Sequence, residues 1–259
     1  MSTHVDLAEE HAWLVEQLRA AGRPQRGAGE NNDSYGSGGH PFFNVSIPDL
    51  RRIARGWLGA HRKRADDAEV IALAGRLITG EAYEEKVLGA VILGYSPRAR
   101  RLATPTMLEA WLDHVAGWAE IDSLCAGVFP AEHMAGDWPA WRALIERLAG
   151  HANINKRRAA LVLLCTTSRT SDDLRFRDLA FEVVERLKGE RPILITKAVS
   201  WLLRSMTQHH AAAVSAYLEA NAPSLPAIAV RETRTKLRSG TKSGRPSKMR
   251  PRGARATPA

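Results

Sequence analysis

One stretch of the sequence places an indole and a carboxylate on the same face of an expected helix. Trp118 and Asp122 are four residues apart, and residues at this spacing project from one side of an α-helix. Cys125 and Phe129 continue that face, so an acid interrupts an otherwise apolar stripe. A carboxylate in such a position can stabilise a developing positive charge or orient a water molecule.

A second tryptophan lies between two cations at helical spacing. Lys197 precedes Trp201 by four residues and Arg204 follows it by three, so the three side chains share one helix face. The remaining tryptophans fall on apolar faces or at the starts of expected helices, where we expect them to pack in the core: Trp13, Trp57, Trp111, Trp138 and Trp141.

Three consecutive cations, Lys156, Arg157 and Arg158, occupy the first turns of a helix whose remainder is apolar. The helix macrodipole disfavours positive charge at this end, so the placement requires an anion. A phosphate of a ligand and a carboxylate of a neighbouring element both fit, and a solvated run of charge is the remaining alternative. Two other basic clusters, within residues 51–55 and 62–64, are typical of ordinary exposed faces.

The signatures of several enzyme classes are missing from the sequence. It contains no glycine-rich phosphate loop, no HExxH pair, no nucleophile elbow and no paired CxxC. Cys125 and Cys165 lie in apolar segments without a partner at metal-ligand spacing, which indicates core thiols. We therefore expect no metal and no cofactor, and the chemistry available is that of a carboxylate, aromatic rings and cations.

The elements that must position these residues are all expected to be helices. Nearly every segment after Pro48 has apolar residues at helical spacing, and none alternates like a strand. Proline and capping residues separate the segments. The expected helices cover residues 5–20, 48–60, 66–79, 82–95, 105–116, 119–134, 137–149, 153–166, 172–188, 191–208, 211–220 and 224–238.

These helices recur in pairs, whose second members begin near residues 82, 119, 153, 191 and 224. A single pair of this size cannot bury its own apolar stripe, so neighbouring pairs must stack to complete a core. The spacing therefore predicts an all-α fold in the form of an α-solenoid of HEAT-like helix pairs. An exception is the stretch of residues 21–47, whose glycine, asparagine and proline residues break helices.

The positive charge of the chain is concentrated at its C-terminal end. The net charge is +9, and residues 231–259 contain ten Lys or Arg and one acid, which leaves 27 basic and 27 acidic residues in the first 230. We expect a repeat domain over residues 1–238 and a basic, disordered tail over 239–259, which can attract phosphates without sequence preference. No apolar stretch is long enough to span a bilayer and no secretory signal is present, which favours a cytoplasmic protein.

Three motifs, in order, resemble those of the bacterial DNA alkylation repair glycosylases of the AlkD type. They are WAEID at residues 118–122, RAA at 158–160 and KAVSWLLR at 197–204. The resemblance extends from Tyr35 to about Arg238. It implies a monomeric DNA glycosylase of HEAT-like repeats whose concave, basic surface holds duplex DNA. Such an enzyme removes N3- or N7-alkylated purines without metal, cofactor or deep base flipping.

The resemblance also implies roles for individual residues. By position, Trp118 and Trp201 pack on the deoxyribose of the lesion, Asp122 is the catalytic carboxylate and Arg158 contacts a backbone phosphate. The remaining residues expected to bind DNA are Arg157, Lys156, Tyr35, Lys197 and Arg204.

Two departures from the family pattern concern the loop before the first motif. Gly36, Ser37 and Gly38 stand where the family usually has a basic residue, and Asn44 stands where it usually has glycine. Asparagine tolerates a positive φ, so the turn at residue 44 can persist. Two alternative functions remain: a non-catalytic DNA-binding HEAT-repeat protein, and a protein-interaction scaffold.

Overall fold

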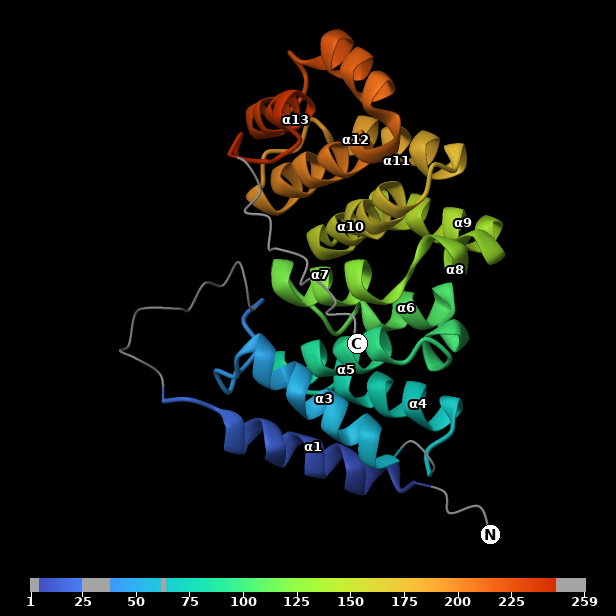
Figure 1. The fold of residues 1–259 in the computed structure, drawn as a ribbon, viewed down its shortest axis with the longest axis vertical. Helices are drawn as coiled ribbons and strands as arrows, with labels where there is room; N and C mark the ends of the chain where they lie inside the picture. Colours follow the sequence, from blue (N-terminus) through green and yellow to red (C-terminus); the bar gives the residue numbers. More distant parts are fainter. Residues whose placement is uncertain (1–4, 25–37, 62–63, 246–259) are drawn as a thin grey trace, which may run out of the picture.

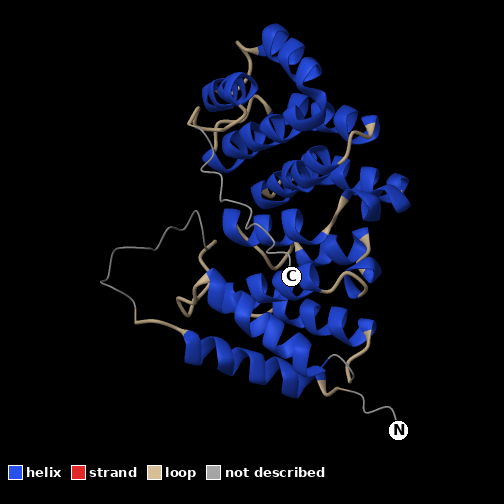
Figure 2. Ribbon diagram, in the orientation of Figure 1, coloured by secondary structure: helices blue, strands red, loops and turns tan. Residues whose placement is uncertain are grey.

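The computed structural model describes residues 5–24, 38–61 and 64–245. Within these residues every regular element is a helix and no strand occurs (Figure 2), which confirms the expected all-α class. The helices are α1 (Leu7–Ala21), α3 (Ile47–His61), α4 (Asp67–Ile78), α5 (Tyr83–Tyr95), η1 (Ala99–Leu102), α6 (Pro105–Trp111), α7 (Gly117–Val128), α8 (Ala131–Gly136), α9 (Trp138–Ala149), α10 (Ile154–Thr170), α11 (Leu174–Leu187), α12 (Ile193–Asn221) and α13 (Ala227–Ser239).

One expected helix is divided into two in the structure. The segment 119–134 is not one helix, because α7 ends at Val128 and α8 starts after Pro130. Proline lacks the backbone N–H that would continue the α7 ladder, so the chain breaks there. The expected break between 191–208 and 211–220 is confirmed, because His210 is non-helical, with φ −125° and ψ 38°, and divides α12 at a kink.

The helices follow one another in space in nearly the order of the chain (Figure 1). Helix α5 packs against α4 and α7, α10 packs against α7, α9 and α12, and α12 packs against α13. The buried apolar side chains form one cluster that runs through these contacts from α1 to α13. As a result, the helices that carry the predicted site residues, α7, α10 and α12, are successive neighbours.

The loop that precedes α3 is held by side chains of the helical body. Glu84 accepts hydrogen bonds from the backbone N–H groups of Phe43, at 2.8 Å, and Val45, at 3.1 Å. Asn44 has φ +62°, so the expected left-handed turn at this position is confirmed. Its amide also donates to the carbonyl of Arg23 at 3.3 Å, a hydrogen bond that glycine could not make.

The start of α7 is fixed by several contacts. Gly117 adopts φ +71°, and its N–H donates to the side-chain oxygen of Asn155 at 3.0 Å. Glu120 accepts from the N–H of Ala116 at 2.8 Å and pairs with His40, also at 2.8 Å. These contacts tie the first turn of α7 to α10 and to the loop before α3, so the direction of the following side chains is set.

No helix in the described part of the chain is long and apolar enough to cross a membrane.

Candidate functional site

Asp122, in the middle of α7, is paired with Arg158 of α10. The Arg158 guanidinium donates from Nε to Oδ1 at 3.0 Å and from Nη2 to Oδ2 at 2.8 Å. Its third nitrogen donates to the carbonyl of Leu194, at the start of α12, at 2.6 Å. A bidentate pair of this kind fixes both the position and the plane of the carboxylate.

The two members of this pair differ in exposure. The Arg158 side chain is 4% exposed, whereas the Asp122 side chain is 19% exposed. Burial raises the pKa of Asp122 above its ordinary value, and the hydrogen bonds and charge of Arg158 oppose that rise. Because two parallel hydrogen bonds from a guanidinium require an acceptor at both oxygens, the geometry holds the ionised form. Asp122 is therefore an oriented carboxylate that solvent can still reach.

Asp122 lines a cavity of about 510 Å³ between α3, α5 and α7. Small residues such as Gly94 and Gly127 make part of its wall, and Arg51 and Tyr95 also line it. The Arg55 guanidinium lies over the Tyr95 ring, 5.6 Å from its centroid. The sequence pattern indicated only an ordinary exposed face for Arg51, because its position in the wall of the Asp122 cavity arises from the packing of three helices.

The two tryptophans of the predicted site lie in different surroundings. Trp118, one turn before Asp122, is 40% exposed. Trp201 is half-buried and packs against the core, and it lines a second cavity, of about 200 Å³, together with Arg204. The cavity that Asp122 lines does not include Trp201, so an acid held between the two indoles stays a prediction.

Each of the three cations at the start of α10 has a carboxylate partner within the protein. Lys156 is buried and its Nζ lies 2.6 Å from Asp113. Arg157 makes two hydrogen bonds to Glu190, at 2.8 and 3.1 Å. Together with the Asp122 pair of Arg158, these contacts show that neighbouring acids supply the anions that the pattern required. Phosphate contacts by these residues stay predictions.

The other expected DNA-binding residues are placed as follows. Lys197 is exposed on α12, whereas Arg204 is half-buried and lies 3.3 Å from Glu232. Burial lowers the pKa of Arg204, and Glu232 opposes the shift. Tyr35 lies outside the described residues.

Several expectations about the core are tested by burial. Cys125 and Cys165 are fully buried free thiols, as expected, and burial raises the pKa of both. The expectation for Trp13 is wrong, because its side chain is 44% exposed on α1.

No group of three potential metal ligands occurs among the residues that the structure describes. The core contains Trp57, Trp111 and Trp141, as expected, and the half-buried Trp138 packs against it.

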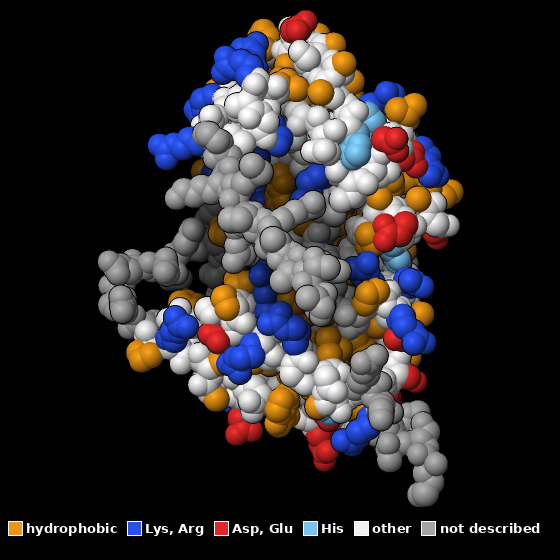
Figure 3. Space-filling model, in the orientation of Figure 1, with side chains coloured by type: hydrophobic (Ala, Val, Ile, Leu, Met, Phe, Trp, Pro, Cys, Tyr) orange, Lys and Arg blue, Asp and Glu red, His pale blue; other side chains and the backbone are white. Residues whose placement is uncertain are grey.

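On the face shown in Figure 3, positively charged side chains lie over α3 and over α13, as well as along the opposite edge. Arg51 of α3 lines the Asp122 cavity. Lys236 of α13 lines the cavity that contains Trp201. Both regions of the candidate site are thus bordered by cations, which attract polyanions such as nucleic acids.

Comparison with curated proteins gives no match. Comparison with protein families gives one match, to a family described as DNA alkylation repair enzyme, over residues 14–237. The matched segment runs from within α1 to within α13 and includes the Asp122 and Arg158 pair and both site tryptophans. The chain belongs to the DNA alkylation repair enzyme family.

Proposed function

We propose that this DNA alkylation repair enzyme is a monofunctional DNA glycosylase. It hydrolyses the N-glycosidic bond of cationic N3- and N7-alkylated purines in duplex DNA. The observation that carries the proposal is the Asp122 carboxylate, which is oriented by two hydrogen bonds and reachable from a cavity. An exposed indole, Trp118, lies one helical turn away from it.

The architecture we infer for the enzyme is an α-solenoid of HEAT-like pairs with a concave DNA-binding surface. Its support is that successive helices pack on one another from α4 to α13 in nearly the order of the chain. Each pair then buries its apolar stripe against its neighbours. Such an array presents side chains from α7, α10 and α12 to one long duplex.

The chemistry needs stabilisation of positive charge on the sugar. A purine alkylated at N3 or N7 is itself a cation and leaves readily, so the deoxyribose develops oxocarbenium character without strong acid catalysis. A carboxylate about 4 Å from that charge contributes up to about 4 kcal/mol at an effective dielectric constant of about 20, or about three orders of magnitude in rate. The ionised Asp122 can supply this charge and can also orient the attacking water.

Arg158 has two opposing effects on this stabilisation. It fixes the carboxylate of Asp122 in advance, so that no reorganisation is needed during the reaction. Its own charge, however, partly cancels the field of Asp122. A backbone phosphate that shares the Arg158 guanidinium would reduce this cancellation, so that binding of DNA strengthens the action of Asp122 on the sugar.

The indoles of Trp118 and Trp201 add a smaller effect. An aromatic face attracts a cation by about 0.5 to 2 kcal/mol. Packed on the deoxyribose of the lesion, each ring would stabilise the charge that develops there. At an undamaged nucleotide the sugar would receive the same electrostatic stabilisation, but a neutral base is a poor leaving group. The selectivity therefore comes from the instability of the lesion itself.

The proposal is tested by measuring base release from three duplexes that carry N3-methyladenine, N7-methylguanine or a bulky N7 adduct, with an undamaged duplex as control. We expect release of both methylated purines above the spontaneous rate, with or without a chelator, and none from the control. Failure to release either methylated purine would reject the glycosylase. Binding of duplex without release would then favour a non-catalytic DNA-binding protein, and absence of DNA binding would favour an interaction scaffold.

A further inference from the structure

The cavity that contains Trp201 is lined by four cations from three helices and the segment that follows the last of them. They are Arg169 at the end of α10, Arg204 on α12, Lys236 on α13 and Lys242 beyond it. The cavity has a volume of about 200 Å³, so these charges lie around a small space. Only Arg204 among them was expected from the sequence to bind DNA.

A single carboxylate, that of Glu232, neutralises part of this charge. Its Oε2 lies 3.3 Å from Arg204 and its Oε1 lies 3.3 Å from Lys242. Ser200 also donates a hydrogen bond to it at 2.7 Å. Burial favours its neutral form, but Ser200, Lys242 and Arg204 together hold the pKa of Glu232 below its ordinary value. Glu232 is therefore an anion.

The other two cations have no carboxylate partner in the described part of the chain. The Lys236 ammonium donates to the carbonyl of Gly240, and Arg169 is exposed at the end of α10. Four cations and one anion leave an excess of three positive charges around the cavity. An arrangement of this kind attracts an additional anion.

The segment after α13 folds back to complete the cavity. Gly240 adopts φ +70° and ends α13, with its N–H bonded to the carbonyl of Lys236 at 2.9 Å. The Thr241 hydroxyl donates to the carbonyl of Arg245 at 2.8 Å. These turns keep Lys242 beside Glu232. Most of the expected tail, residues 246–259, lies outside the described residues.

We propose that this cavity binds one phosphodiester group of the DNA. In the absence of DNA, Glu232 forms ion pairs with Arg204 and Lys242, which the phosphate replaces when it binds. The inference rests on the proposed function, because Trp201 forms part of the cavity wall and would pack on the lesion's deoxyribose. The bound phosphate is then the one attached to that sugar or its neighbour. The charge of Glu232 repels phosphate and weakens the binding of undamaged DNA.

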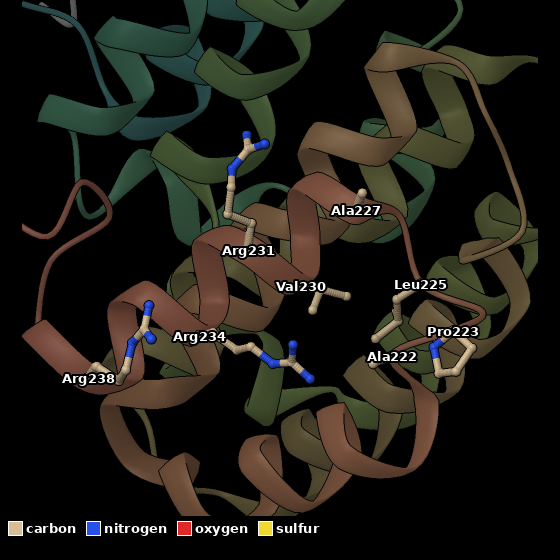
Figure 4. Close-up of a pocket in the computed structure, with 8 residues that line it drawn as sticks. All are labelled: Ala222, Pro223, Leu225, Ala227, Val230, Arg231, Arg234 and Arg238. Carbon is tan, nitrogen blue, oxygen red and sulfur yellow. The ribbon is translucent and has the colours of Figure 1, made fainter.

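A second basic surface on α13 provides a matched control. Arg231, Arg234 and Arg238 line a cavity with apolar residues such as Val230 (Figure 4). They lie on the side of α13 opposite to its buried residues, and none of them lines the Trp201 cavity. Arg234→Ala therefore removes one cation from the same helix while leaving the proposed phosphate site intact.

The test measures the affinity of the full-length protein for undamaged duplex at several salt concentrations. We expect Lys242→Ala and Arg169→Ala each to weaken binding about threefold to tenfold and to reduce the salt slope by about one. Glu232→Gln keeps the hydrogen bond to Ser200 but removes the charge, and we expect it to tighten binding by a similar factor. Arg234→Ala should change the affinity by less than about twofold. Thermal melting curves check that each variant is folded.

Unchanged affinity of both Lys242→Ala and Arg169→Ala would overturn the proposal. An equal loss in Arg234→Ala would also overturn it, because the effect would then reflect overall charge rather than the cavity. Weaker or unchanged binding by Glu232→Gln would contradict the role of that acid. Because these measurements use undamaged DNA, they are independent of base release, and a failure of the glycosylase proposal would be seen separately.

Discussion

Arg158 determines the orientation of Asp122 before any substrate is bound. Its two hydrogen bonds to the carboxylate and a third to the carbonyl of Leu194 join α7, α10 and α12. Breaking a pair of this kind is costly because the remaining charge is left buried. The side chain of Asp122 is thus held by the fold itself, which is what a group that acts on a developing charge requires.

At this scale, spacing alone predicted which residues share a helix face. Trp118 and Asp122 do lie one turn apart on α7. The identity of the Asp122 partner could not be predicted, since it depends on how α10 packs against α7. For the same reason, Arg51 and Tyr95 were missed as residues that line the Asp122 cavity.

Trp118 and Trp13 offer a matched pair of tryptophans for testing the role of the exposed indole. They are exposed to similar extents, 40% and 44%, and neither lines the Asp122 or the Trp201 cavity. Trp118, however, lies one turn before Asp122 on α7, whereas Trp13 lies on α1. We expect Trp118→Ala to lower the single-turnover release of N7-methylguanine by about tenfold, since a cation–π contact contributes about 0.5 to 2 kcal/mol. Trp13→Ala should leave the rate unchanged. Equal rates in the two variants would show that the Trp118 indole has no part in the reaction.

At the scale of elements, the loop before α3 supports the start of α7. Gly38 has φ +61°, and a Cβ atom added there would lie 2.4 Å from the Cβ of Ala116. Gly39 also has a positive φ, +87°, but a Cβ atom there would meet nothing within 4 Å. The close approach at Gly38 brings the loop against the residues that precede Trp118.

This difference predicts unequal effects of two alanine substitutions. A positive φ costs a non-glycine residue about 1 to 2 kcal/mol, so both Gly38→Ala and Gly39→Ala should lower stability. Gly38→Ala adds a clash with the backbone of Ala116, and we expect it to lower the melting temperature several degrees further. Equal melting temperatures for the two variants would show that the loop can shift at Gly38 without a loss of stability.

The apolar period predicted most helices, and its failures have physical causes. The period continues through Phe129 into α8, so the pattern alone suggested one helix where Pro130 separates two. In α12, by contrast, the expected break between residues 208 and 211 is present as the non-helical His210. Helix periodicity reports which face is buried, whereas a break or a junction depends on single residues and on packing.

In the molecule as a whole, the net positive charge is concentrated in the C-terminal part of the chain, whereas the helices extend along most of it. The first 230 residues are balanced in charge, and the excess of nine positive charges arises from residue 231 onwards. The described part of this basic region is α13 and the turns through Arg245, which pack on α12 beside Trp201. Within this region, Lys236 and Lys242 line the Trp201 cavity, and we expect these two cations to attract DNA next to the candidate site.

The proposed reaction requires that the charge of Asp122 drives base release by a protein that binds DNA through other residues. The most direct measurement compares wild type with Asp122→Asn in single-turnover release of N7-methylguanine and in affinity for the same duplex. Asparagine keeps the size of the side chain but not its charge, so we predict a fall in rate of about three orders of magnitude and an affinity within about threefold. Release at the wild-type rate by a folded Asp122→Asn protein would contradict the account.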